Sequence, residues 1–190
     1  MVLPKSSPWG TVQSWKNIAT GIDLATTSSH GGIKLSGSRQ TRMPEAFKVK
    51  GGWYEEDVKL YFVVLAFPNC FEEKYTEIAH KMIKNYYPDN YAKWSEKPVS
   101  LEESLVLRQK KFAEENVNNY VTLAAFGSWH ENVPQGMIGV FAGKGGRKEN
   151  GQYPDDCKEF LVPEKEYEER NELPFVIDIN RHKEFKFLNR

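Results

Sequence analysis

The sequence lacks several features that mark specialised classes of protein. It has two cysteines, Cys70 and Cys157, and neither belongs to a CxxC pair, which argues against a disulfide framework. Its longest apolar run, Tyr61–Phe67, is far shorter than the roughly 20 residues that span a bilayer. The first ten residues hold no apolar stretch typical of a secretory signal. We therefore expect a soluble protein of a reducing cytoplasm, with free thiols and no membrane contact.

An excess of charge of either sign is also missing. Lys and Arg number 26, Asp and Glu number 26, and the formal net charge is zero. This balance excludes a dispersed polycation of the histone type and an acidic solvating tail. Aromatic residues, in contrast, make up 13% of the chain, and each ring buries roughly 150–250 Å² in a core. We expect a single domain over residues 1–190, in which residues 1–10 form a lead-in segment and Trp9 docks on the body.

The order of the predicted elements favours an α+β fold. Loosely alternating runs at 11–19, 21–27 and 31–35 are separated by glycines, which predicts a meander of short strands. A polar stretch at 36–43 predicts a short helix before Pro44. Four further strand candidates are 120–126, 137–141, 159–162 and 175–179. Without βαβ alternation, we expect a mostly antiparallel sheet with a central helical segment, about residues 55–116, packed on it. Whether the strands form one sheet or two stays open.

Three patterns place helices in the central segment. The acids Glu55, Glu56 and Asp57 precede an apolar run at 58–67 and would complement a helix dipole, although that run also fits a buried strand. A second pattern consists of apolar residues at steps of 4, 3, 4 and 4 along the chain, namely Phe71, Tyr75, Ile78, Met82 and Tyr86. This spacing predicts an amphipathic helix that ends before Pro88. Ser100 and Glu103 form a capping box, which predicts a helix from there to about Asn116.

One group of residues is a candidate for acid–base catalysis. His30 is flanked by serines and glycines, so it could act as a general base beside glycine amides that stabilise an oxyanion. Its carboxylate partner would be Glu55, Glu56 or Asp57. A plain turn at His30 and a helix start with aromatic anchors at the acids explain the same residues. The four histidines show no HxxxH or HExxH spacing, and the glycine loop at 142–148 lacks the Walker ending, so no metal or cofactor is predicted.

A second group is a candidate for binding a charged partner. Between Asp155 and Glu172, eight acids face three bases, and a small basic loop precedes them. A solvated surface with local ion pairs is one interpretation, and a dipolar surface that steers a partner is the other. The candidate partner-binding residues are Asp155, Asp156, Glu164, Glu166, Glu168, Glu169, Lys144 and Arg147.

Aromatic rings among cations suggest a third use. Tyr86, Tyr87, Tyr91, Lys93 and Trp94 could stack on nucleic-acid bases. The neutral total charge and the absence of an RNP-like motif argue against direct nucleic-acid binding.

Several strings of the chain resemble an uncharacterised family, a domain of unknown function found in phages, plasmids and prophages. The strings are SPWG at 7–10, ATGI at 19–22, SHGGIKLS at 29–36, GGWYEED at 51–57, GGR at 145–147, FLVP at 160–163 and FVID at 175–178. The resemblance implies no established reaction or ligand. It implies a setting, that of a small accessory protein of a mobile element, working in the cytoplasm of a bacterial host cell.

That setting suggests what the protein does. Mobile elements carry such proteins to block host immunity, so we expect an anti-defence, anti-CRISPR-like inhibitor that binds a host defence protein complex and blocks it sterically or electrostatically. The acidic 155–172 segment would then be the docking surface. The alternative is an enzyme acting on a small molecule or a nucleic acid through His30 and one of the three acids. A partner of the element's own replication machinery fits equally, and the oligomeric state stays open.

Overall fold

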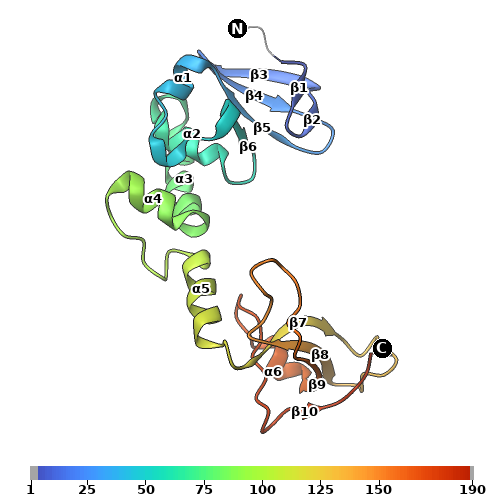
Figure 1. The fold of residues 1–190 in the computed structure, drawn as a ribbon. Coiled ribbons are helices and arrows are strands. Elements are labelled where there is room, and N and C mark those ends of the chain that lie inside the picture. The colour runs from blue at the N-terminus through green and yellow to red at the C-terminus, as the bar shows by residue number, and fades with distance from the viewer. Residues whose placement is uncertain (1–3, 189–190) are drawn as a thin grey trace. The chain divides into compact units, whose positions relative to one another are not determined.

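A computed structural model describes residues 4–188 and divides into two compact units, drawn in Figure 1. Unit 1 runs through Arg108 and unit 2 begins at Gln109. The expected α+β fold is confirmed, because helices and antiparallel sheets occur together. The strands form two four-stranded sheets and a two-stranded ribbon. The single domain over 1–190 stays a prediction, since compact units need not fold independently.

Unit 1 is a four-stranded meander covered by helices. Its elements are β1 (Ser6–Ser7), β2 (Gly10–Thr11), β3 (Ser14–Ala19), β4 (Ile22–Thr26), β5 (Gly31–Leu35), α1 (Gly37–Thr41), β6 (Trp53–Glu55), α2 (Leu60–Ala66), α3 (Glu73–Tyr86) and α4 (Pro88–Ser95). The sheet order is β3-β4-β5-β6, with every neighbour antiparallel. Gly21 closes the β3–β4 turn with φ of 76°, a left-handed conformation that glycine adopts without strain.

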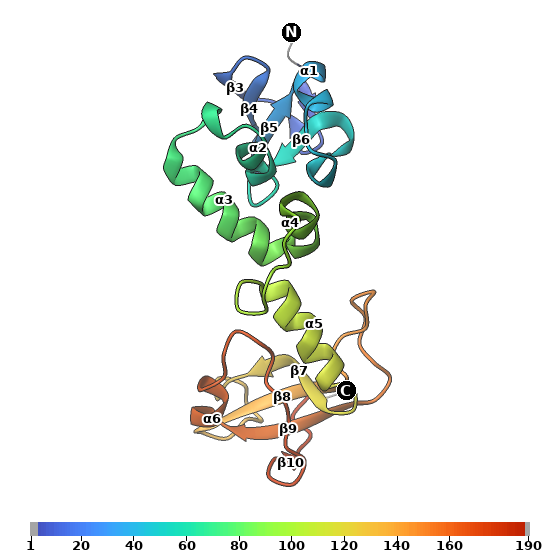
Figure 2. The ribbon, with the colours of Figure 1, turned by 90° about the vertical axis from the view of Figure 1, so that its left-hand side faces the viewer.

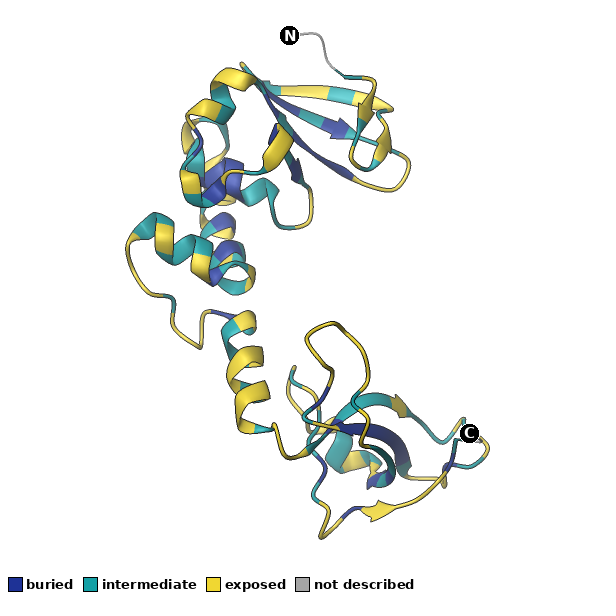
Figure 3. Cartoon of the chain, in the orientation of Figure 1, coloured by how far each residue is buried: buried dark blue, intermediate teal, exposed yellow. Residues whose placement is uncertain are grey.

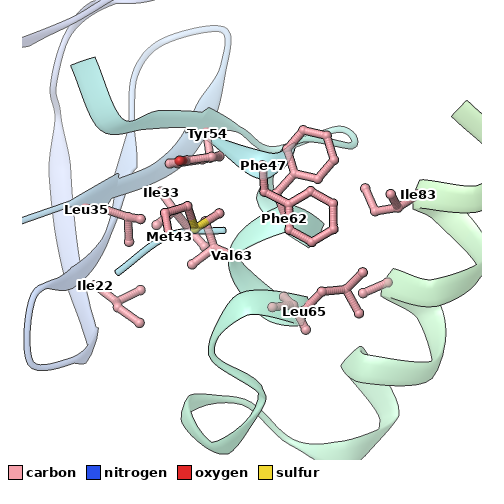
Figure 4. Close-up of a cluster of buried hydrophobic side chains, with 12 residues drawn as sticks. Ile22, Ile33, Leu35, Met43, Phe47, Tyr54, Phe62, Val63, Leu65 and Ile83 are labelled. Carbon is pink, nitrogen blue, oxygen red and sulfur yellow. The ribbon is translucent and has the colours of Figure 1, made fainter. Parts of the chain in front are cut away.

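Alternation along the strands separates two faces of this sheet. Ile22, Leu24 and Ile33 share the inner face with Leu35 and Tyr54. Figure 4 shows four of these residues, Ile22, Ile33, Leu35 and Tyr54, in one cluster with Phe62, Val63 and Leu65 of α2 and with Ile83 of α3. Tyr54 is fully buried, and its hydroxyl donates to Gln40 Oε1 at 3.2 Å. The core of unit 1 therefore lies between the inner face and helices α2 and α3.

Helix α5 (Leu105–Glu115) crosses the boundary between the units. Unit 2 continues with β7 (Tyr120–Phe126), β8 (Met137–Lys144), β9 (Cys157–Pro163), α6 (Glu164–Glu168) and β10 (Lys183–Glu184). The sheet order is β10-β9-β8-β7, again antiparallel throughout. Figure 3 shows buried residues mainly along β8, in the middle of this sheet, whereas β10 at its edge is exposed. Its core cluster is built from Ile138, Val140, Ala142, Phe160, Val162 and Ile177.

The last two described residues, Phe187 and Leu188, are held to strand β9. Phe187 is buried, and its backbone N–H donates to Glu159 Oε2 at 2.7 Å. The N–H of Leu188 donates to the same oxygen at 2.8 Å. One carboxylate thus satisfies two successive backbone donors and holds Phe187 in the core.

Two predicted elements differ from the structure. The strand expected at 175–179 is wrong: this segment forms one isolated bridge, between Val176 and Val121. Asp178 turns the chain instead, because its carboxylate accepts from Asn180 N–H and its carbonyl accepts from His182 N–H. The acids at 55–57 are not in the first turn of a helix, since Glu55 ends β6 and α2 begins at Leu60.

None of the helices within residues 4–188 combines the length and apolar character needed to cross a membrane. Cys70 and Cys157 are not joined in a disulfide, and both are of intermediate burial.

Candidate functional site

Strands β5 and β6 bring the two longest family-like strings together. Gly32 lies opposite Glu55, Ile33 opposite Tyr54, and Lys34 opposite Trp53. The string SHGGIKLS, which contains β5, and the string GGWYEED, which contains β6, are therefore hydrogen-bonded neighbours (Figures 1 and 2). Ile33 and Tyr54 fill the core, whereas Lys34 and Trp53 lie on the outer face.

Three tryptophans cluster on that outer face. The Trp9 ring meets the Trp53 ring edge-on at 5.6 Å between centroids, and Trp15 lies 5.8 Å from Trp53. The Lys34 ammonium lies 5.1 Å from the Trp53 centroid and donates to the Gly51 carbonyl. Burial lowers the pKa of Lys34. The prediction that Trp9 docks on the body is confirmed, and the cluster covers the outer face with half-buried rings.

Gly32 makes this docking possible. A Cβ added there would lie 2.3 Å from Trp9 Cη2 and 2.4 Å from the Tyr54 carbonyl oxygen. Both distances are far below van der Waals contact, and the second involves backbone that cannot move aside. Only glycine allows the Trp9 ring to approach β5 this closely at this position.

His30, Glu55 and Asp57 lie near one another, where β5 begins and β6 ends. His30 is exposed in the β4–β5 turn, where Thr27 Oγ1 accepts its backbone N–H at 3.1 Å. Burial raises the pKa of Glu55, the Asp57 carboxyl raises it further, and His30 opposes the rise. Glu55 Oε1 also accepts the Asp57 N–H at 3.3 Å. A carboxyl with a raised pKa, beside a second carboxyl and an imidazole, is suited to taking up and releasing a proton.

Glu56 lies apart from this pair. Its carboxylate lies over Gly31, with Oε2 only 2.4 Å from where a Cβ would stand. None of the catalytic candidates lines any of the three cavities described in residues 4–188; these candidates are His30, Glu55, Glu56 and Asp57. Residues 4–188 also contain no group of three or more His, Cys, Asp or Glu side chains arranged to hold a metal ion.

The acidic segment of unit 2 is partly used by the fold. Glu166 binds both Arg181, at 3.0 Å, and the buried His182, at 3.2 Å. Asp155 pairs with Lys148 at 3.2 Å, and Asp156 accepts from the Tyr120 hydroxyl at 2.8 Å.

The other partner-binding candidates are more open. Glu168 and Glu169 are exposed, as is Lys144 at the end of β8, and Glu164 begins α6. Arg147 Nη1 donates to the Gly151 carbonyl at 3.2 Å, and its guanidinium lies 4.6 Å from the Tyr153 ring centroid. Their role in binding a partner stays a prediction.

Most of the rings considered for base stacking are part of the unit 1 core. Tyr87 packs on Phe62 at 5.1 Å between centroids, and Trp94 packs on Phe47 at 5.3 Å. The Tyr91 hydroxyl lies 2.9 Å from His80 Nδ1. These rings join α4 to the core and leave little free aromatic surface for a nucleic-acid base.

Helix α3 presents a surface that the periodicity did not predict. The helix is confirmed at Glu73–Tyr86, but its buried residues are the smaller Ala79 and Ile83. The larger Tyr75, Ile78 and Tyr86 are 39%, 40% and 40% exposed. With the partly buried Met82 they form an outward strip, which we call the α3 stripe. The spacing identifies the apolar arc but not which edge of it meets the core.

Comparison with known proteins gives one match. The family described as Domain of unknown function (DUF7007) matches residues 2–117. No curated protein matches the chain. No solved structure matches it either. The matched residues include unit 1 and all of α5, so the C-terminal strings at 145–147, 160–163 and 175–178 lie outside the match.

Proposed function

The chain belongs to the DUF7007 family, a domain family of unknown function, and from that premise we propose that it is a protein-binding inhibitor of the anti-defence type. In this proposal it is an accessory protein of a phage, plasmid or prophage and blocks a bacterial immune effector by occupying its surface. The observation that carries the proposal is the α3 stripe, which lies within the residues that the family shares.

The energetics of the stripe favour a docking role. Large side chains that are about 40% exposed leave on the order of 80 Å² each in water. Burying that area in a partner would contribute about 2 kcal/mol of binding free energy per side chain, at roughly 25 cal/mol per Å². Smaller residues of the same helix occupy the core instead. A helix face of this kind, with anchors at i, i+3 and i+7, suits insertion into an apolar groove of a partner protein.

Charge at the edge of the stripe indicates the rim of that groove. Lys74 and Lys81 are seven residues apart on α3 and both neighbour Ile78 on the helix surface. Lys74 pairs with Glu72 at 2.7 Å, whereas Lys81 has no carboxylate within ion-pair distance in residues 4–188. We therefore expect an apolar groove with an acidic rim on the partner, and the acidic 155–172 segment becomes a secondary contact.

The test uses bacterial strains that each carry one defence system. Expression of the protein should raise the plating efficiency of a targeted phage by an order of magnitude or more in at least one strain. Ile78→Asp should abolish the effect with an unchanged melting temperature, while Ile179→Asp, at a residue 66% exposed in unit 2, should keep it. The proposal would be contradicted if the protein raised the plating efficiency in none of the strains, or if Ile78→Asp kept full activity.

A second candidate function has its own support. The raised pKa of Glu55, next to Asp57 and within electrostatic reach of His30, is an arrangement suited to proton transfer. Such an enzyme would act on a small molecule or a nucleic acid at the exposed corner of β5 and β6. His30→Ala and Glu55→Gln should then abolish the phage phenotype, whereas Ile78→Asp should not. Retention of the phenotype in both His30→Ala and Glu55→Gln would exclude this candidate.

A further inference from the structure

Unit 1 contains a cavity of about 620 Å³ that no function yet uses. Its floor is the inner face of the sheet, where Lys16, Leu24 and Ile33 lie directly opposite one another on β3, β4 and β5. Helix α2 supplies Leu60 and Val64 as a wall. The segment Asn69–Glu72 and Tyr75 complete the lining. A volume of this size lies within the roughly 300–1,000 Å³ typical of small-molecule sites.

The lining separates into an apolar interior and a polar rim. Leu24, Ile33 and Val64 come from the buried layer of unit 1 and offer no hydrogen-bonding group. At the rim, Lys16 is exposed and has no carboxylate within ion-pair distance in residues 4–188. The side chain of Asn69 likewise makes no hydrogen bond within that part of the chain. The rim therefore offers one free cation and one free amide beside an apolar interior.

The one carboxylate in the lining is already neutralised. Glu72 forms an ion pair with Lys74, with 2.7 Å between Oε2 and Nζ. Asn17 donates its amide to Asp23 at 2.7 Å and to the Ala19 carbonyl at 3.0 Å, so it is held by the sheet. The Cys70 sulfur accepts from Arg39 Nη2 at 3.7 Å, which places a second cation behind the lining. The charge left at the cavity is positive.

We propose that this cavity binds an amphipathic carboxylate, a small molecule whose apolar tail fills the interior and whose carboxylate pairs with Lys16 at the rim. The apolar lining favours the tail over any fully polar ligand. The unpaired ammonium selects an anionic head group, because a cationic head would be repelled by Lys16 at the rim. The Asn69 amide donates a second hydrogen bond to the carboxylate. This site shares Tyr75 with the α3 stripe, but the other residues of the stripe lie outside its lining.

Calorimetric titration of the full-length protein with sodium decanoate tests the proposal, with decyltrimethylammonium as the cationic probe of equal tail length. Decanoate should bind with a stoichiometry of one, and the ammonium should not. Lys16→Glu should weaken decanoate binding by about tenfold or more. Lys50→Glu, which changes the same charge at an exposed position outside the cavity, should leave the affinity unchanged.

A second variant tests the location of the tail. Asn69 is exposed at the mouth, so Asn69→Trp should block entry and remove binding of decanoate without lowering the melting temperature. Three results would overturn the proposal: no heat with decanoate, equal binding of both probes, or an unchanged affinity in Lys16→Glu. None of these results depends on the phage assay, because neither Lys16 nor Asn69 belongs to the α3 stripe.

Discussion

At the scale of single residues, Gly32 couples β5 to the Trp9 ring. We expect Gly32→Ala to lower the free energy of unfolding by about 1–3 kcal/mol, because the new methyl group must displace the ring or the backbone at Tyr54. Displaced tryptophans become more hydrated, so the emission maximum should also shift to the red. Chemical denaturation followed by tryptophan fluorescence measures both effects.

The matched control for this substitution is Gly37→Ala. Gly37 opens helix α1, and a Cβ there would meet no heavy atom within 4 Å. Alanine is also the better helix former, so stability should stay equal or rise slightly. If both alanine variants were equally stable, the close approach of Trp9 to Gly32 would not be a constraint on the fold.

At the scale of elements, helix α5 shows what a local pattern leaves out. The capping box at Ser100 predicts a start there, and half of it forms, since Glu103 Oε2 accepts the Ser100 N–H at 3.3 Å. The helix nevertheless begins at Leu105. Ser104 is fully buried, and its hydroxyl accepts the Leu107 N–H at 3.2 Å and donates to the Asn85 carbonyl at 3.0 Å. The start of α5 is therefore set by a contact with Asn85 of α3, a residue distant in the sequence.

We expect Ser104→Ala to destabilise the protein by about 1–2 kcal/mol, because the helix loses its N-cap and the Asn85 carbonyl loses a donor. Ser100→Ala should cost less than about 0.5 kcal/mol, since Ser100 is exposed and its backbone keeps the Glu103 contact. Urea denaturation of both variants measures the difference. If Ser100→Ala were the more destabilised variant, Ser100 and not Ser104 would be the N-cap of the helix.

The pairing of α3 with α4 predicts a pH effect. Burial lowers the pKa of His80, and the neighbouring Lys84 lowers it further. Lys84 is itself held by Glu103, and the Tyr91 hydroxyl lies 2.9 Å from His80 Nδ1. Because the unfolded chain takes up the proton first, the stability from neutral His80 is present above about pH 6.5 and is lost as the pH falls through the folded-state pKa.

The measurement is the melting temperature from about pH 7.5 down to about pH 5. Wild type should lose more stability over this interval than His80→Gln, which cannot titrate. Parallel curves for the two proteins would mean that His80 does not contribute. His30→Gln, at a histidine exposed in a turn, serves as the control for replacing a histidine by glutamine.

Local sequence patterns were sufficient for much of this architecture. The glycines and alternation at residues 11–35 predicted β3, β4 and β5, and the spacing from Tyr75 to Tyr86 predicted α3. The orientation of α3 was not predictable, because Ala79 and Ile83 form a second apolar row beside the larger side chains. Neither was the closeness of His30 to Glu55, which depends on the pairing of β5 with β6 across the 17 residues 36–52, which include α1. Such long-range pairing is set by tertiary contacts.

At the scale of the whole molecule, the chain carries two separate cores. Unit 1 buries Ile22, Phe47, Tyr54 and their neighbours, and unit 2 buries a second cluster around Val140 and Phe160. The family match ends at residue 117, two residues after helix α5. The end of the match and the division into compact units thus lie close together in the sequence. This agreement favours unit 1 with α5 as a folding module of its own.

We therefore expect scanning calorimetry of the full-length protein to resolve two transitions. Unit 2 has the smaller core and should melt first, because hydrophobic burial supplies most of the stability of each unit. Val140→Ala should lower the first transition alone, and Phe62→Ala the second alone, each by several degrees, since large-to-small core changes cost about 1–5 kcal/mol. One transition that both variants shift, with equal calorimetric and van't Hoff enthalpies, would instead establish the single domain that composition suggests.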